Sequence, residues 1–164
     1  MRRLAKVTGL TAVLALSACS GGGAKPSLDA SASSTTVAEP NGTIVIGTNT
    51  FVFVMTCYAP GTGALVAVGT GTDPVSGHPT RALVQAFFND PYVGVTVGDK
   101  ESVYEATLDE PIDLSFQDNV VTGTAIRFVR NLDLTARVGE PVGTGSVSVT
   151  CSSYSAGLPP GYGS

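Results

Sequence analysis

The chain has 164 residues, of which 43% are hydrophobic and 13% charged, and its nine basic and thirteen acidic residues give a formal net charge of −4. An acidic chain without a run of lysine or arginine is not expected to bind nucleic acid, because phosphate contacts need clustered cations. The length fits one folded domain.

The first 18 residues have the pattern of an export signal. The basic segment MRRLAK is followed by VTGLTAVLALSA, an apolar run far shorter than the roughly 20 residues that cross a bilayer core. A basic head, a short apolar body and small residues at the end are typical of a signal peptide that is removed. We therefore expect residues 1–18 to be cleaved.

Residues 16–19, Leu-Ser-Ala-Cys, resemble the bacterial lipobox, in which the cysteine thiol receives a diacylglycerol and becomes residue one. Acylation at Cys19 is chemically reasonable because sulfur is the most nucleophilic side chain there. The alternative is an ordinary secretory signal with a chance cysteine. Without the signal peptide six basic residues face thirteen acidic ones, so anionic lipid would not attract the chain. We expect the acyl anchor to hold the protein on the extracytoplasmic face of the cell membrane, in the cell envelope.

Two cysteines remain, Cys57 and Cys151, an even pair suited to an oxidising compartment. A disulfide between them would close nearly the whole folded region and contribute about 4 to 5 kcal/mol in the chain-entropy model. Two free buried thiols are the alternative. A zinc site is disfavoured, because one histidine and two distant cysteines are too few ligands.

Residues 19–42 are expected to be a flexible linker that begins with the acylated cysteine. Serine, glycine, alanine and proline dominate this segment and no apolar periodicity occurs in it, so it has little to bury. Hydroxyl residues cluster at 31–36. They fit either O-glycosylation or plain solvated linker.

Residues 43–155 are expected to form one all-β domain, and residues 156–164 a loose tail. Short segments rich in β-branched and aromatic residues alternate with Gly, Pro and Asx turns. Their even spacing predicts a small antiparallel β-sandwich, or a partly open barrel. TRALVQAFF, residues 80–88, is interpreted as a strand, although its composition also suits a helix. The expected strands are TIVIGT, FVFVMTCYA, ALVAVGTG, YVGVTVG, SVYEATL, IDLSF, VVTGTAIRFV and SVSVTCS.

These features together resemble the mycobacterial 19 kDa lipoprotein antigen family (LpqH-like). The matching pieces are LSAC at 16–19, MTCYAPGTGALVAVG at 55–69, VTGTA at 121–125 and VSVTCS at 147–152. The resemblance implies an acylated surface antigen that host lipopeptide receptors recognise through its lipid. It also implies mannosylation of linker threonines, which Thr35 and Thr36 match. The chain departs from the family in its charged middle and in a tail that runs past Cys151.

No catalytic or metal motif is present, so we expect no enzyme activity, cofactor or metal. His78 is the only histidine and lies in a turn, without a serine or cysteine nucleophile motif. A cluster of carboxylates has no calcium-loop spacing and is interpreted as charge that keeps strand edges soluble. A hydrolase that uses two of them is the least favoured hypothesis. The cluster comprises Glu101, Glu105, Asp109, Glu110, Asp113 and Asp118.

The six phenylalanines fit either core packing or an apolar cavity. Adjacent Phe87 and Phe88 would point to opposite faces of a strand, so one of them would reach outward or into a groove. The sequence therefore favours a lipid-anchored, non-enzymatic antigen or a binding or structural module. The alternative is a carrier that holds a lipid or another hydrophobic envelope molecule in a cavity between two sheets.

Overall fold

A computed structural model describes residues 38–162 of the chain, apart from Thr62 and Phe88. The signal peptide, Cys19, Thr35 and Thr36 therefore lie outside the described residues, and so does Phe88. Predictions that concern these positions stay predictions.

The described residues form nine antiparallel strands and no helix, which confirms the all-β prediction. The segments rich in valine, threonine and phenylalanine become strands because such side chains pack well on a pleated surface. The strands are β1 (Gly42–Ile46), β2 (Asn49–Gly61), β3 (Ala64–Thr72), β4 (Pro79–Ala86), β5 (Tyr92–Val97), β6 (Ser102–Ala106), β7 (Ser115–Gln117), β8 (Val120–Asp133) and β9 (Val138–Thr150).

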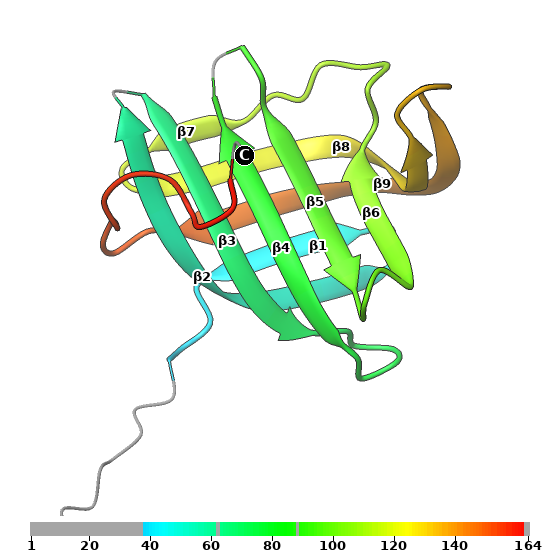
Figure 1. Cartoon of the computed structure of the whole chain (residues 1–164), viewed down its shortest axis with the longest axis horizontal. Coiled ribbons are helices and arrows are strands. Elements are labelled where there is room, and N and C mark those ends of the chain that lie inside the picture. The colour runs from blue at the N-terminus through cyan, green and yellow to red at the C-terminus, as the bar shows by residue number, and fades with distance from the viewer. Residues whose placement is uncertain (1–37, 62, 88, 163–164) are drawn as a thin grey trace, which may run out of the picture. The chain divides into compact units, whose positions relative to one another are not determined.

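The strands close into a barrel, so the prediction of a sandwich is wrong and the alternative of a barrel is closer to the structure. The neighbours run in the order β6-β5-β4-β3-β2-β1-β9-β8-β7, and a further pairing of β6 with β8 completes the ring (Figure 1). Eight strands form the ring, while β7 pairs with the first part of β8. Closure depends on the length of β8. Its 14 residues pair with β9 along one edge and with both β7 and β6 along the other.

A bulge in β8 lets this long strand bend round the barrel. The pairing with β9 shifts between Gly123 and Ile126, and Ala125 has a φ of 56°. Such a bulge adds twist and bends its strand. On β9, Gly145 lies where a Cβ atom would collide with the carbonyl oxygen of Val45. Gly145 therefore lets β9 approach β1 more closely than a residue with a side chain would.

The barrel interior is filled by alternate side chains. In β2, Phe51, Phe53 and Met55 are buried, whereas Val52 and Val54 between them are exposed. A Cβ on Gly69 of the neighbouring strand would collide with the sulfur of Met55. The side chain of Met55 thus occupies the space that the glycine leaves, and the interior is packed rather than hollow at this level.

The segment 80–88, whose composition also suits a helix, contributes a strand. β4 covers Pro79–Ala86 and pairs with β3 and β5 on its two edges. Ala82, Val84 and Ala86 point into the core. Alternate residues of this segment are buried, as in a strand. This burial outweighs the helix propensity of alanine, leucine and glutamine.

Cys57 and Cys151 form a disulfide with a Cα–Cα distance of 5.9 Å, and both residues are buried. The bond joins β2 to the residue that follows β9. The chain after Cys151 then crosses the outer face of β2, β3 and β4 (Figure 1).

Residues 156–162, expected to be loose, lie against that outer face together with the residues before them. The amide of Ser155 donates a 2.8 Å hydrogen bond to the Cys57 carbonyl oxygen. Pro159 is buried, and the Tyr162 hydroxyl donates a hydrogen bond to the Gln85 side-chain oxygen. These contacts tether the tail at both of its ends.

Candidate ligand-binding site

The acidic side chains singled out in the sequence do not converge on one point. Glu101 pairs with His78, Glu105 accepts a hydrogen bond from Tyr92, and Asp118 lies in the turn between β7 and β8. Across residues 38–162 without the two gaps, no group of three His, Cys, Asp or Glu side chains is placed to hold a metal ion.

His78 contacts a carboxylate across two turns. Its Nδ1 atom lies 2.7 Å from Oε2 of Glu101, and the side chains are 49% and 62% exposed. Exposed polar contacts of this kind contribute little to stability. The contact fastens the β3–β4 loop to the β5–β6 turn.

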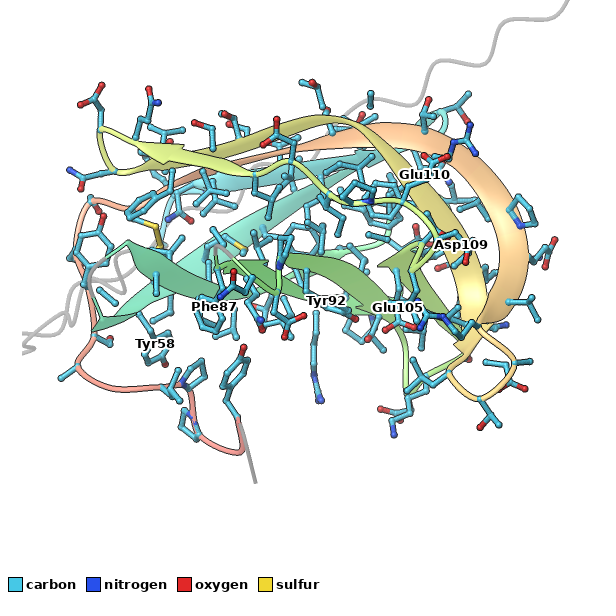
Figure 2. The ribbon with its side chains drawn as sticks, turned by 90° about the horizontal axis from the view of Figure 1, so that it is seen from above. Tyr58, Phe87, Tyr92, Glu105, Asp109 and Glu110 are labelled. Atoms are coloured by element: carbon cyan, nitrogen blue, oxygen red, sulfur yellow. A yellow bond between two sulfur atoms is a disulfide. The ribbon has the colours of Figure 1, made fainter. Side chains whose placement is uncertain are left out.

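Tyr92 and Glu105 form a polar contact that the sequence analysis missed. The Tyr92 hydroxyl donates a 2.6 Å hydrogen bond to Oε1 of Glu105 on the neighbouring strand (Figure 2). The ring of Tyr92 lies over Gly94, where a Cβ atom would collide with it. Burial, then the hydrogen bond to Glu105 and its charge, raise the pKa of Tyr92 above its usual value. Gly94 has no side chain and so leaves room for the ring. A glycine two residues after a tyrosine in the same strand is the feature of the sequence that could have indicated this packing.

The barrel wall is interrupted between β5 and β7. The pairing of β5 with β6 ends at Gly94 and Glu105, so Tyr92 and Val93 have no partner on that edge. β6 pairs with β8 only as far as Ala106, and one more backbone bond joins the Thr107 amide to the Arg127 carbonyl oxygen at 2.9 Å.

Pairing with β8 resumes at Ser115 in β7. Among the residues that the structure describes, 108–114 form no backbone–backbone hydrogen bond. We call the interruption between the start of β5 and residues 108–116 the seam.

A hollow of about 310 Å³ opens at the seam. This volume is near the lower end of the range found for ligand sites. Phe87 lines it and is half-buried (Figure 2). Three half-buried side chains line the opposite side of the hollow and pack against the core, namely Ile112, Leu114 and Phe116. The full lining is Gly63, Ala86, Phe87, Pro91, Ile112, Asp113, Leu114 and Phe116.

A second hollow of about 390 Å³ lies beneath the curved ends of β8 and β9. Asp109 and Glu110 are on its rim, beneath that curve (Figure 2). Nη1 of Arg127 lies 2.9 Å from Oε1 of Glu110, and Nη2 of Arg137 donates a 3.1 Å hydrogen bond to the Leu108 carbonyl oxygen. The two hollows therefore flank one segment, residues 107–114.

The outer face of the barrel has an uneven distribution of charge. Strands β1 to β5 contain a single charged residue, Arg81. Val52 and Val54 on this face are 45% and 36% exposed. A shallow hollow of about 410 Å³ lies on the same face, where Val54, Val68 and Arg81 line it. Apart from Arg81 and the part that the chain after Cys151 crosses, this face has no charge and is open to contact with another molecule.

Of the residues that the sequence analysis proposed for ligand binding, Phe87 lines the seam hollow and Phe88 lies outside the described residues. Within the described ranges, no helix is long and apolar enough to span a membrane. No protein-family model, no curated protein and no solved structure matches this chain.

Proposed function

We propose that the protein is a lipid-anchored lipoprotein of the cell envelope, with no enzyme activity, whose barrel serves as a surface antigen or as a binding or structural module. One observation carries the proposal. Cys57 and Cys151 are bonded to each other, which leaves Cys19 of Leu-Ser-Ala-Cys as the one cysteine of three available for acylation.

The disulfide also supports export, since such bonds persist in oxidising compartments. The folded part begins at Asn41, whose side chain accepts a 2.6 Å hydrogen bond from the Met55 amide and donates one of 2.8 Å to the Thr150 carbonyl oxygen. Residues 20–40 would then act as the tether. As a flexible coil they would hold the barrel on the order of 25 Å from the membrane anchor.

In this proposal the acyl group provides the membrane contact and the feature that host lipopeptide receptors recognise. Thr35 and Thr36 on the tether are the proposed glycosylation positions. The uncharged face of β1 to β5, with Val52 and Val54 exposed, is the surface through which the barrel would contact another protein. Apolar surface of this kind is typical of interaction sites.

Replacing the acceptor thiol tests the anchor. Cys19→Ser should move the protein from the detergent phase to the aqueous phase after cloud-point partitioning of cells. Ser20→Ala, one residue along, is the matched control and should partition like the native chain. A Cys19→Ser chain that remains in the detergent phase contradicts the proposal.

A second candidate function is carriage of a small hydrophobic molecule, and the seam hollow favours it. The barrel interior contains packed side chains, so the bound molecule would lie at the seam beside Phe87 rather than between two sheets. Native mass spectrometry of the full chain, purified from its host without added lipid, should then show a bound apolar molecule. A mass equal to that of the acylated chain alone would speak against carriage.

A further inference from the structure

We propose that residues 107–114 form a cover over the seam, fastened by Arg127 and Arg137, which opens to admit an unbranched alkyl chain. The inference rests on the second of the functions proposed above, carriage of a hydrophobic molecule. It adds the site of entry, the class of ligand and the residues that control access.

The cover is attached firmly at its ends and weakly between them. Backbone hydrogen bonds fix Thr107 to Arg127 at one end, and the pairing of β7 with β8 fixes Ser115 to Thr122 at the other. Between these points the contacts to the rest of the barrel come from side chains. Such a segment can swing outward without breaking a strand ladder, because residues 108–114 have no place in one.

Two arginines hold the middle of the cover. Arg127 pairs with Glu110, and their side chains are 64% and 49% exposed. Arg137, on the other side of the second hollow, donates its hydrogen bond to Leu108. Exposed contacts of this kind are weak. They bias the cover toward the closed position without locking it.

Apolar burial supplies the rest of the closing force. Ile112 and Leu114 reach from the cover to the core, and lifting them would expose both their own surface and the surface beneath them to water. An alkyl chain that enters the seam would replace that lost contact. Opening is therefore costly in water and becomes favourable when an apolar ligand is present.

The lining of the seam hollow exposes polar and apolar surface in about equal measure, which suits an amphiphile with one apolar chain. Six of its eight residues have apolar side chains, and the single charged one, Asp113, is exposed. A volume of about 310 Å³ is large enough to hold one alkyl chain. A charged head group would remain in water at the rim.

The first test is limited proteolysis of the full chain by thermolysin, with the products identified by mass spectrometry. Arg127→Gln and Arg137→Gln should each speed cleavage within residues 108–114 about two- to fivefold, because cleavage follows the population of the opened cover and the contacts removed are exposed ones. Arg130→Gln is the matched control. It breaks the exposed pair of Arg130 on β8 with Glu140 on β9 and should leave cleavage within 108–114 unchanged. Equal effects of all three variants, or no effect of any, would overturn the proposal.

The second test is calorimetric titration with dodecanoate, in the Cys19→Ser background so that no acyl group of the protein competes. The chain should bind dodecanoate and not butanoate. Phe87→Asp, which introduces a charge into the hollow, should weaken binding about tenfold or more. Val75→Asp, on an exposed and distant loop residue, should not.

The effect of Arg127→Gln on ligand affinity distinguishes a cover that controls access from a segment that only contributes to stability. Since the alkyl chain takes the place of Ile112 and Leu114 against the core, binding needs the cover to be lifted, and Arg127→Gln should lower the apparent Kd of dodecanoate about two- to fivefold. A chain that binds dodecanoate but is unaffected by Arg127→Gln lacks the cover and keeps the carrier function. A chain that does not bind dodecanoate refutes the inference together with carriage. Neither outcome bears on the lipid anchor, which the partitioning of the Cys19→Ser chain tests.

Discussion

Cys57 and Cys151, 94 residues apart in the sequence, are joined by a buried disulfide that holds the chain after β9 against β2. Strands β3 to β9 lie inside the loop that this bond closes, whereas β1 and the first part of β2 precede Cys57. The bond therefore restrains the unfolded chain over most of the length that has to fold.

Removing the disulfide should destabilise the barrel strongly. The double variant Cys57→Ala, Cys151→Ala should lose about 3 to 5 kcal/mol of unfolding free energy, measured by urea titration. Adding a reductant to the native chain should produce a similar loss and leave the double variant unchanged. A loss below about 1 kcal/mol would show that the bond contributes little.

Thr80 should be replaceable by valine with a gain in stability. Its side chain is buried at 2% exposure, and its hydroxyl has no hydrogen-bond partner among the described residues. Valine has nearly the same shape and removes the unpaired hydroxyl, so Thr80→Val should gain about 1 kcal/mol. Thr70→Val on the exposed side of the adjacent strand is the control and should change stability by less than about 0.5 kcal/mol. Destabilisation by Thr80→Val would imply a partner for the hydroxyl.

Ala125 should tolerate glycine better than other alanines do. Its φ of 56° lies in the left-handed region, which costs a residue with a Cβ about 1 to 2 kcal/mol. Relief of that strain exceeds the extra entropy of glycine in the unfolded chain, so Ala125→Gly should stabilise the barrel by about 0.5 kcal/mol. Ala82→Gly, at a buried strand position, should destabilise it. Thermal unfolding of both variants checks the opposite signs.

Tyr92 should make the barrel sensitive to alkaline pH. Its pKa is raised on folding, first by burial and then by Glu105. The folded state therefore holds the phenol proton more tightly than the unfolded state, whose pKa is near 10. The resulting stabilisation is complete below that value and declines as pH rises above it.

Urea titrations at pH 9 and pH 11 measure this dependence. Tyr92→Phe should be about 1 kcal/mol less stable at pH 9 and should lose less stability between the two pH values than the native chain. Tyr154→Phe, which removes a hydrogen bond to Asn119, serves as the control and should keep the native slope. If Tyr92→Phe keeps the native slope, the group responsible lies elsewhere.

Much of the secondary structure could be predicted from local patterns. The β-branched and aromatic residues of FVFVMTCYA and YVGVTVG predicted β2 and β5, because such side chains pack well on a pleated, half-buried surface. The turn at Asp118 and Asn119, both with positive φ, followed from the tolerance of Asx residues for that region. The even number of cysteines after Cys19 favoured the bridge that the structure contains, with two free thiols as the alternative.

Closure of the barrel could not be predicted, because it depends on pairings between strands far apart in the sequence. The pairing of Tyr104 with Arg130 leaves no periodic mark in either segment. The bulge at Ala125 was equally hidden, since alanine gives no sign of a positive φ. The seam depends on which parts of β8 pair with β6 and β7, so the sequence pointed to Phe87 without revealing what lies opposite it.

The most direct test of the account is the intact mass of the native protein, isolated from the membranes of its own host. The account predicts a chain that begins at Cys19 and carries the mass of a diacylglycerol and any further acyl chain on that residue, with Cys57 and Cys151 oxidised. A mass that corresponds to an unmodified Cys19, or to a chain that retains residues 1–18, would contradict it.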